Sequence, residues 1–248
     1  MKLAILTAMH ARHELNEIFC SAMGRIRANY NAQTYVALSH NDDKNLRLCM
    51  FWGFPTIVTK NNPVSNKFNK GLSLLRDEDW THVMILGSDD IPSNKFIEIQ
   101  MQSARDHDIS MISDMWFWGL NPKRAGFDKF YYFPGGSSRI GAGRVISRRV
   151  IEACNYTIWP DDKNAGLDSG SLARMRNTVP DVRMSAVNLR DAGGFLVDVK
   201  YELHISSLSP IERIGEEVDN DIIWEHLPPG ECQSLLNLRA KVKGDEKE

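Results

Sequence analysis

Membrane and secretion signals are the first features that this sequence lacks. No stretch approaches the roughly 20 consecutive apolar residues that a membrane-spanning helix requires, since even residues 111–120 are interrupted by Ser113 and Asp114. The apolar run within residues 1–7 is far shorter than the apolar core of a secretory signal, and polar and charged residues follow it from His10 onward. We therefore expect no membrane span and a cytoplasmic location.

The sequence also has few cysteines and no excess of positive over negative charge. The four cysteines, at positions 20, 49, 154 and 232, are widely spaced and fit neither a zinc site nor a disulfide framework, so free thiols are expected. The 30 Lys and Arg residues face 32 Asp and Glu, for a formal net charge of -2. Proteins that neutralise many phosphates usually carry a basic excess. The charge balance therefore does not favour nucleic acid as a partner.

Apolar runs alternate with stretches of helical period through the first half of the chain, which is typical of repeated βαβ units around a mostly parallel sheet. The predicted strands are Lys2–Ala8, Thr34–Ser39, Thr56–Thr59, His82–Leu86 and Ile109–Ser113. The predicted helices between them are Arg12–Asn29, Lys44–Trp52, Ser65–Arg76 and Ser93–Asp106. An α/β fold with an open sheet follows, and such sheets bind ligands beyond the carboxyl ends of their strands.

The second half of the chain has a different character. Residues 131–136 lead into a glycine-rich turn, and helices are predicted over 147–154 and 166–177. The glycines at 135–136 and within 141–144 indicate a close approach of the backbone to a ligand, or turns alone. Residues 195–205 alternate like a late strand, with Asp198 and Lys200 on one face. We expect one domain over 1–208, divided into a nucleotide-binding half (1–115) and an acceptor half (116–208), followed by a helical extension with a charged tail over 209–248.

The strongest local signal is the end of the fourth predicted strand, where an apolar run closes abruptly on Asp89 and Asp90. Adjacent carboxylates repel each other unless a positive charge lies beside them, and oxygen ligands suit Mg²⁺ or Mn²⁺. The pair therefore predicts a metal site. In the alternative, Ser88 or Asp89 caps the helix that begins near Ser93, with Pro92 setting the turn.

One helix upstream, Asn66-Lys67-Phe68-Asn69-Lys70-Gly71-Leu72 places amides and ammonium groups before the acidic turn. In their order along the chain and in their residue types, these two segments resemble those of the inverting family-2 glycosyltransferases of the GT-A fold. The resemblance implies a GT-A (Rossmann-like) open mixed sheet flanked by helices, with a C-terminal acceptor region and a short helical tail. Gly87 departs from it, because that family usually has the first acidic residue of its Asp-x-Asp motif at this position.

The same resemblance implies a catalytic base. Residues 166–172 are similar to the family's Glu-Asp-x-x-Leu segment, in which the aspartate removes the proton of the acceptor hydroxyl, and Asp168 takes that place although Leu167 replaces the glutamate. An ordinary helix N-cap at Asp168 is the alternative. Asp161 and Asp162 compete for the role, although they are more typical of a solvated turn.

Further ligands follow from the resemblance. His204 lies where that family often has a third metal ligand, and a half-buried strand histidine is the alternative. The residues expected to bind the nucleotide-sugar donor are Thr7, Ala8, His10, Asp42, Lys67, Asn69, Ser88 and Asp89. The aromatic residues at 116–118 and 131–133 either form a platform for a sugar ring or pack in the core.

Three functions remain open at this stage. The first is a metal-dependent inverting glycosyltransferase that uses a UDP-type donor and Mn²⁺ or Mg²⁺, with a glycan or another hydroxyl-bearing acceptor. A modified DNA base is a further acceptor that the net charge does not favour. The second is a nucleotidyltransferase of related fold, although residues 7–12 contain no glycine for a phosphate-binding loop. The third is a carbohydrate-binding module without catalytic activity, in which Gly87 marks the lost activity.

Overall fold

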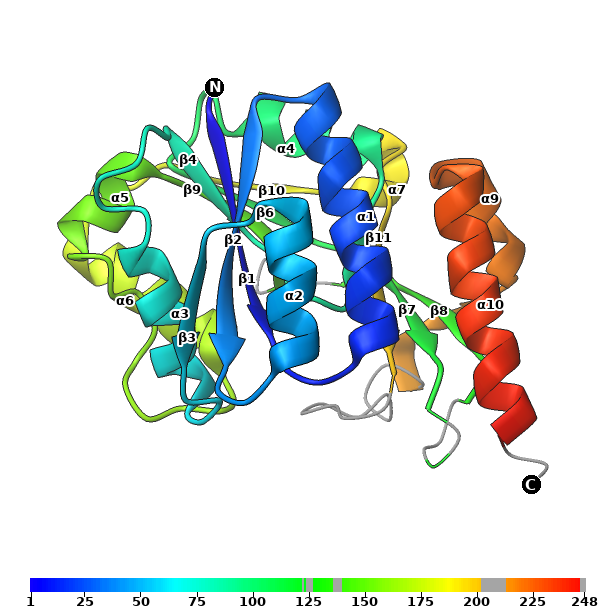
Figure 1. The fold of residues 1–248 in the computed structure, drawn as a ribbon. Helices are drawn as coiled ribbons and strands as arrows, with labels where there is room; N and C mark the ends of the chain where they lie inside the picture. Colours follow the sequence, from blue (N-terminus) through cyan, green and yellow to red (C-terminus); the bar gives the residue numbers. More distant parts are fainter. Residues whose placement is uncertain (122, 124–126, 136–139, 202–212, 246–248) are drawn as a thin grey trace.

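A computed structural model of the chain describes residues 1–121, 123, 127–135, 140–201 and 213–245. The strands are β1 (Leu3–Met9), β2 (Ala32–Ser39), β3 (Thr56–Thr59), β4 (His82–Ile85), β5 (Asp90–Pro92), β6 (Ile109–Ile112), β7 (Met115–Gly119), β8 (Phe130–Phe133), β9 (Ile140–Ser147), β10 (Met184–Val187), β11 (Leu196–Lys200) and β12 (Glu216–Val218). The helices are α1 (His13–Asn29), α2 (Asp43–Trp52), α3 (Val64–Ser73), α4 (Asn94–Ser103), α5 (Arg148–Ala153), α6 (Leu167–Thr178), α7 (Leu189–Ala192), α9 (Ile223–His226) and α10 (Pro229–Asp245). Figure 1 shows their arrangement.

Within the described residues, the larger sheet has seven strands in the order β10-β6-β9-β4-β1-β2-β3. The chain runs outward from β1 through β2 to β3 and then returns to the other side of β1 to form β4, with all of these strands parallel. The sheet therefore has a topological switch point between β1 and β4. In open α/β sheets this is where a crevice opens beyond the carboxyl ends of the strands.

Alternation along β1 places the sheet between two apolar layers. Leu3, Ile5 and Met9 belong to one core cluster, which also takes in α1, whereas Ala4 and Leu6 belong to the other, which also takes in α3 and α6. Side chains of a strand point to opposite faces in turn, so a strand buried on both faces reads as a continuous apolar run. This burial explains why β1 was recognisable from sequence.

A second sheet has the order β12-β8-β7-β11-β5 among the described residues. β5 begins directly after the acidic turn that follows β4, and it pairs antiparallel with β11, so that Asp90 lies opposite Asp198. Neither the three-residue strand β5 nor the strands β7, β8 and β12 were predicted from sequence. β5 and β12 are only three residues long and pair with distant segments, whereas β7 and β8 are aromatic runs, a composition that fits either a strand or core packing.

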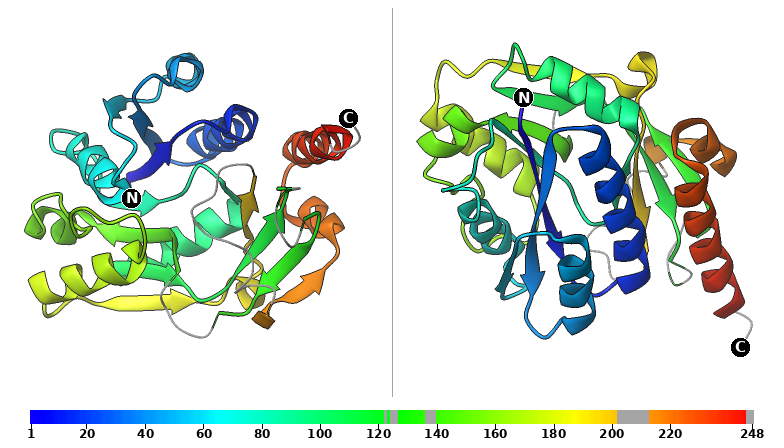
Figure 2. Two further views of the ribbon diagram at one scale, coloured as in Figure 1. Left: turned by 90° about the horizontal axis from the view of Figure 1, so that it is seen from below. Right: turned by 45° about the horizontal axis from the view of Figure 1, so that its top comes forward.

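The C-terminal helix α10 runs beside α1 (Figures 1 and 2). Arg25 of α1 donates to both carboxylate oxygens of Glu231 on α10, at 2.6 and 3.0 Å, and to the carbonyl of Pro92 at 2.7 Å. Both Arg25 and Glu231 are largely shielded from solvent, with 14% and 6% of their side chains exposed. This ion pair therefore connects α10 to α1 and to the end of β5.

Most of the predicted elements are confirmed within three residues at each end. The alternative of a turn at 141–144 is wrong, because these residues lie in β9, between β4 and β6. The late strand is confirmed over Leu196–Lys200, and the remainder of its predicted range extends beyond the described residues. All four cysteines are free and buried, as expected. No helix in the described part of the chain is long and apolar enough to span a membrane.

Candidate active site

Three carboxylates meet at the switch point between β1 and β4. Asp89 and Asp90 follow β4, and Asp198 comes from β11; each offers one oxygen, and these oxygens all lie within 4.8 Å of one another. The helix-cap alternative for the acidic turn does not hold. Ser93 is the N-cap of α4, because its hydroxyl accepts the amide hydrogen of Phe96 at 3.1 Å.

The strand pairing places like charges face to face. Asp90 and Asp198 are cross-strand partners in β5 and β11, and like charges in this position are destabilising. Burial, together with the neighbouring aspartates, raises the pKa of Asp90 well above its usual range. Burial likewise raises the pKa of Asp198 to about 6, although Lys200 opposes the shift. The fold therefore holds these carboxylates where their ionised forms are unfavourable without additional positive charge.

Two basic side chains supply part of that charge. Arg12, just after β1, donates from Nη1 to Asp89 Oδ2 at 2.8 Å and from Nη2 to Ser88 Oγ at 3.0 Å. Lys200 forms an ion pair with Asp198 two residues before it on β11. Burial alone would disfavour both cations, but the aspartates outweigh it and raise the pKa of Arg12 and of Lys200. With all five groups ionised, the cluster keeps one net negative charge.

Gly87 provides the room for this arrangement. Its amide donates to Asp90 Oδ2 at 2.6 Å, and a Cβ at this position would collide with the carboxylate of Asp89. The glycine that replaces the family's usual acidic residue thus lets two carboxylates fold back over the end of β4. The third carboxylate of the cluster comes from Asp198 instead, on a distant strand.

In the metal-free protein, Asp90→Asn is expected to increase stability at pH 8 by about 1–2 kcal/mol, a typical gain when an unfavourable functional group is removed. The folded-state pKa of Asp90 is raised, so the folded protein binds its proton more tightly than the unfolded chain does. Parent stability should therefore fall as the pH rises from about 4. The gain should vanish near pH 4. Urea unfolding at both pH values measures it, with the exposed Asp161→Asn as control; an equal gain at pH 4 would contradict the electrostatic explanation.

Asp168 lines a pocket together with the acidic cluster. The residue is exposed to solvent, in the first turn of α6, but its carboxylate rests against the β9 backbone. Local burial by the pocket walls raises the pKa of Asp168, while Arg144 and the Gly141 amide, which donates to the carboxylate, oppose the shift. The alternative of a helix N-cap does not hold, because Gly166 occupies the cap and Asp168 makes no cap hydrogen bond.

Gly141 and Arg144 fix the position of this carboxylate. A Cβ on Gly141 would collide with the carboxylate of Asp168. Arg144 is buried and donates from Nη1 to the Asp168 carbonyl at 3.2 Å and to Ser171 Oγ at 2.9 Å. The glycine and the arginine stand three residues apart on β9, and together they determine where the first turn of α6 and its carboxylate lie.

Gly141→Ala is therefore expected to move the Asp168 carboxylate out of place. If Asp168 takes part in transfer, the rate should fall about tenfold, as for modest misplacement of a reacting group. Donor binding and the melting temperature should change little. Transfer assays on this variant check the expectation, with Gly230→Ala on α10 as the control because an added Cβ at Gly230 meets no atom within 4 Å. An unchanged rate would show that the contact is irrelevant.

The acidic cluster and Asp168 line one pocket. Its walls include the apolar side chains of Phe68, Ile158, Trp159 and Leu167, and the rings of Phe68 and Trp159 lie 5.0 Å apart. Gly141 and Arg144 belong to the segment for which a close approach to a ligand was one expectation, whereas Asp198 was not expected to contribute to the site. Asp198 was visible as part of an alternating strand, but its pairing with β5 could not be read from the sequence.

The residues expected to bind the donor lie around the ends of β1, β2 and β4. Thr7 is buried, whereas His10 is exposed, and burial of its ring together with Lys67 lowers the pKa of His10. Asp42 accepts the amide hydrogen of Ala11 at 2.9 Å and so holds the loop after β1. Ala8 is partly exposed beside them. These side chains share one edge of the sheet.

Lys67 and Asn69 are bonded within the protein. The Lys67 ammonium donates to the Met9 carbonyl (2.5 Å), Ser39 Oγ (2.7 Å) and Asn61 Oδ1 (3.2 Å). Burial lowers the pKa of Lys67 to about 8. The Asn69 amide bonds both backbone groups of Trp159. The three bonds use all three N–H groups of Lys67, so contact of its ammonium with a nucleotide sugar would require one of them to be given up. The bonds of Asn69 use only one of its two amide N–H groups.

The remaining predicted residues divide into three groups. His204 lies outside the described residues. Of the aromatic residues, Trp116, Trp118, Tyr131 and Tyr132 are buried, so a six-residue sugar platform is wrong and core packing accounts for most of them. Asp161 and Asp162 are exposed in a turn, as expected of a solvated segment.

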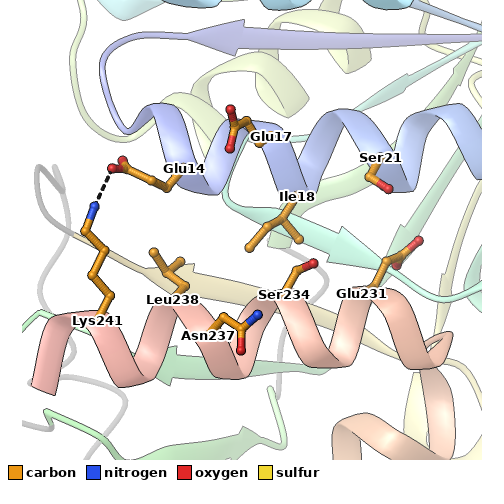
Figure 3. A pocket seen from close by; sticks show the side chains of 9 residues that line it. All are labelled: Glu14, Glu17, Ile18, Ser21, Glu231, Ser234, Asn237, Leu238 and Lys241. Carbon is orange, nitrogen blue, oxygen red and sulfur yellow. Dashed lines mark hydrogen bonds and ion pairs between the residues drawn. The ribbon is translucent and has the colours of Figure 1, made fainter. Parts of the chain in front are cut away.

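A larger groove lies between α1 and α10 (Figure 3). Its volume of about 330 Å³ exceeds the 150 Å³ of the pocket beside the acidic cluster. Its lining combines exposed polar side chains with buried ones such as Glu231, and Glu14 pairs with Lys241 at 2.7 Å. Among the described residues, the carboxylates that could hold a metal lie in the smaller pocket. The smaller pocket is therefore the candidate active site.

No model of a known protein family matches this sequence, and no curated protein is significantly similar to it. Solved structures do share its fold. TarS (residues 1–349) from S. aureus, solved with UDP, superimposes with a TM-score of 0.56 at 12% identity, over 80% of this chain and 60% of TarS. Glucosyl-3-phosphoglycerate synthase from Mycobacterium tuberculosis, solved with Mn²⁺, UDP and phosphoglyceric acid, gives 0.53 at 11% identity over 86% and 74%.

A third structure has a different activity. 4-diphosphocytidyl-2C-methyl-D-erythritol synthase from Anaerococcus prevotii superimposes with a TM-score of 0.50 at 11% identity, over 75% of this chain and 86% of the synthase. These similarities confirm the GT-A fold, an open mixed α/β sheet flanked by helices. At such identities they establish the fold alone, and one fold carries many functions. This chain spans less than two thirds of TarS.

Proposed function

We propose that the protein is a metal-dependent inverting glycosyltransferase that moves a sugar from a UDP-type donor to a hydroxyl acceptor. One observation carries the proposal: the acidic cluster and Asp168 line the same pocket. The cluster is suited to the diphosphate end of a donor, and Asp168 to the acceptor end. A base placed across the pocket from the leaving group is the arrangement that in-line displacement requires.

The cluster has the chemistry of a site for Mn²⁺ or Mg²⁺. Hard oxygen ligands are what these ions prefer, and Asp198 Oδ1 is buried without a hydrogen-bond partner among the described residues. An unpartnered buried oxygen beside two other carboxylates fits a missing cation. Asp89, Asp90 and Asp198 would hold the ion, and His204 stays in the proposal as a further ligand. The ion would neutralise the charge of the departing diphosphate.

Residues of the protein would accept the proton and position the substrates. Asp168 would accept the proton of the acceptor hydroxyl, and its raised pKa makes it a better base than an ordinary carboxylate. Arg144 and Gly141 would keep the carboxylate in position. The ring of Trp159 lies at the pocket wall, where a sugar can pack against an aromatic face. The residues proposed to contact the donor remain Thr7, Ala8, His10, Asp42, Lys67, Asn69, Ser88 and Asp89.

The acceptor is proposed only as a hydroxyl-bearing molecule such as a glycan. The phosphoglyceric acid bound to the Mycobacterium synthase and the UDP bound to TarS belong to those proteins, but they support a donor and acceptor of related chemistry here. A modified DNA base is not favoured, given the net charge of -2.

The test is release of UDP from UDP-glucose, UDP-galactose and UDP-N-acetylglucosamine, with Mn²⁺, with Mg²⁺ and with a chelator. Slow hydrolysis that depends on the metal is expected for at least one donor, even without an acceptor. Binding of UDP without any turnover would favour the carbohydrate-binding module. Absence of both binding and turnover would contradict the proposal.

A nucleotidyltransferase is the second candidate, because the Anaerococcus synthase has the same fold. Residues 7–12, Thr-Ala-Met-His-Ala-Arg, contain no glycine, which is unfavourable for a loop that wraps a triphosphate. Pyrophosphate release from CTP or UTP with a sugar phosphate would identify this activity. The two reactions can be measured on one preparation.

A further inference from the structure

The loop between β1 and α1 is held in a costly conformation. Ala11 and Arg12 both have positive φ, at 49° and 48°, and each such residue without glycine's freedom costs roughly 1 kcal/mol or more. The loop is fixed by its neighbours: the Ala11 carbonyl accepts hydrogen bonds from Asn16 (2.7 Å) and Asn45 (2.8 Å), and the Ala11 amide donates to Asp42. Asn16 and Asn45 are buried.

The result of this conformation is the position of Arg12. Its guanidinium reaches across the switch point to Asp89 and Ser88, and 11% of the side chain is exposed. Within the described part of the chain, the guanidinium donates to these two acceptors. A guanidinium has five N–H groups, so some of them remain available for another acceptor. Arg12 also directly precedes the N-terminus of α1, where helix dipoles favour anions.

Arg12 and a divalent ion would compete for the same carboxylate. Arg12 binds one oxygen of Asp89, a carboxylate of the cluster proposed to hold the metal, and two positive charges on one carboxylate repel each other. The side chains of Arg12 and Lys200 are about equally shielded, with 11% and 9% exposed, but Lys200 pairs with a residue of its own strand, whereas Arg12 reaches the cluster from a separate loop. Of the two cations, Arg12 is therefore the one placed to leave the cluster.

From this geometry we infer that Arg12 is a diphosphate-binding residue: it pairs with Asp89, as in this structure, and transfers to the diphosphate of a nucleotide when a metal binds. The inference rests on the proposed function. A guanidinium matches two oxygens of a phosphate at once, and the fixed loop keeps it beside the site in either state. The residue would thus couple metal binding to donor binding.

The experiment is calorimetric titration of Mn²⁺ alone, and of UDP, GDP and CDP at saturating Mn²⁺, into the parent, Arg12→Gln and Arg12→Lys. Without the competing cation, Arg12→Gln is expected to bind Mn²⁺ several-fold more tightly. It should bind the preferred nucleoside diphosphate about 10- to 100-fold more weakly, the value of a hydrogen-bonded charge. Arg12→Lys should lie between the parent and Arg12→Gln for both ligands. Arg47→Gln, an exposed arginine on α2, is the control and should bind both ligands as the parent does.

The inference predicts that Arg12→Gln changes the affinities for Mn²⁺ and for the nucleotide in opposite directions. A general loss of structure would weaken both. Parallel weakening of the two, or unchanged nucleotide binding in Arg12→Gln, would overturn the inference while leaving the proposed function intact. If the parent itself binds neither Mn²⁺ nor any of the three nucleotides, the proposed function fails and the inference fails with it. Melting temperatures in metal-free buffer confirm that the variants are folded.

Discussion

Asp168→Asn is expected to lower sugar transfer by about 100-fold or more while leaving the binding of Mn²⁺ and UDP unchanged. The loss is the usual contribution of a general base. Binding should survive, because the three carboxylates of the proposed metal site are Asp89, Asp90 and Asp198, and Asp168 is outside that cluster. Asparagine has nearly the same shape, and its side-chain oxygen can still accept the hydrogen bond of the Gly141 amide.

The pH dependence gives an independent test of the same residue. Burial raises the pKa of Asp168, and only the deprotonated form can accept a proton. Transfer by the parent should therefore decline as the pH falls through that raised pKa, and the residual activity of Asp168→Asn should lack this decline. Asp161→Asn, in an exposed turn, should behave like the parent in both tests.

UDP binding is measured by calorimetry and sugar transfer by product formation, both on one preparation of Asp168→Asn. Together they show whether Asp168 acts in transfer or in binding. Near-normal transfer by Asp168→Asn would remove this residue from the mechanism. Loss of UDP binding together with transfer would instead indicate that Asp168 supports the shape of the pocket.

The acidic turn was recognisable from sequence because its signal is local. An apolar strand that stops at two adjacent carboxylates is informative without knowledge of the rest of the fold, and the structure places Asp89 and Asp90 at the end of β4. β1 through β4 were also predictable, since burial on both faces leaves long apolar runs. Asp168 entered through a family resemblance, and its neighbours confirm only its position in the pocket.

Asp198 and Arg12 show why the rest of the site was not predicted. Asp198 joins the cluster because β11 pairs with a strand of three residues about a hundred positions earlier, and strand pairing of this kind depends on tertiary contacts. Arg12 reaches Asp89 only because the loop before α1 adopts positive φ values. Neither alanine nor arginine signals such a conformation, which is imposed by Asn16, Asn45 and Asp42.

The glycines of β9 were ambiguous in the sequence for a related reason. Gly141 and Gly143 indicated either a close approach to a ligand or a turn, and they lie in β9. Gly141 is required by the carboxylate that packs on it, and Gly143 by its φ of 70° and the ring of Phe96. In a strand, glycine marks a close approach of other atoms as often as a change of direction, and the sequence does not distinguish the two.

Glu231→Ala is expected to destabilise the protein by about 3–5 kcal/mol, the usual effect of removing one partner of a buried ion pair. The substitution leaves the Arg25 guanidinium without the two carboxylate oxygens that it binds at 2.6 and 3.0 Å. The exposed pair Lys129–Glu217 (2.9 Å) is the matched control: Glu217→Ala should cost less than about 1 kcal/mol. Urea unfolding of both variants measures the difference.

This ion pair also bears on the site, because Arg25 donates to the carbonyl of Pro92 at the end of β5, the strand that carries Asp90. Glu231→Ala should therefore weaken Mn²⁺ binding as well as stability, whereas Glu217→Ala should change neither. The double variant Arg25→Met/Glu231→Leu separates the two effects, since it removes the buried charges together and should recover most of the lost stability. If Glu231→Ala costs no more than Glu217→Ala, α10 is not held by this ion pair, and contacts such as those of Leu235 and Leu238 in the apolar core carry the docking of the C-terminal helix.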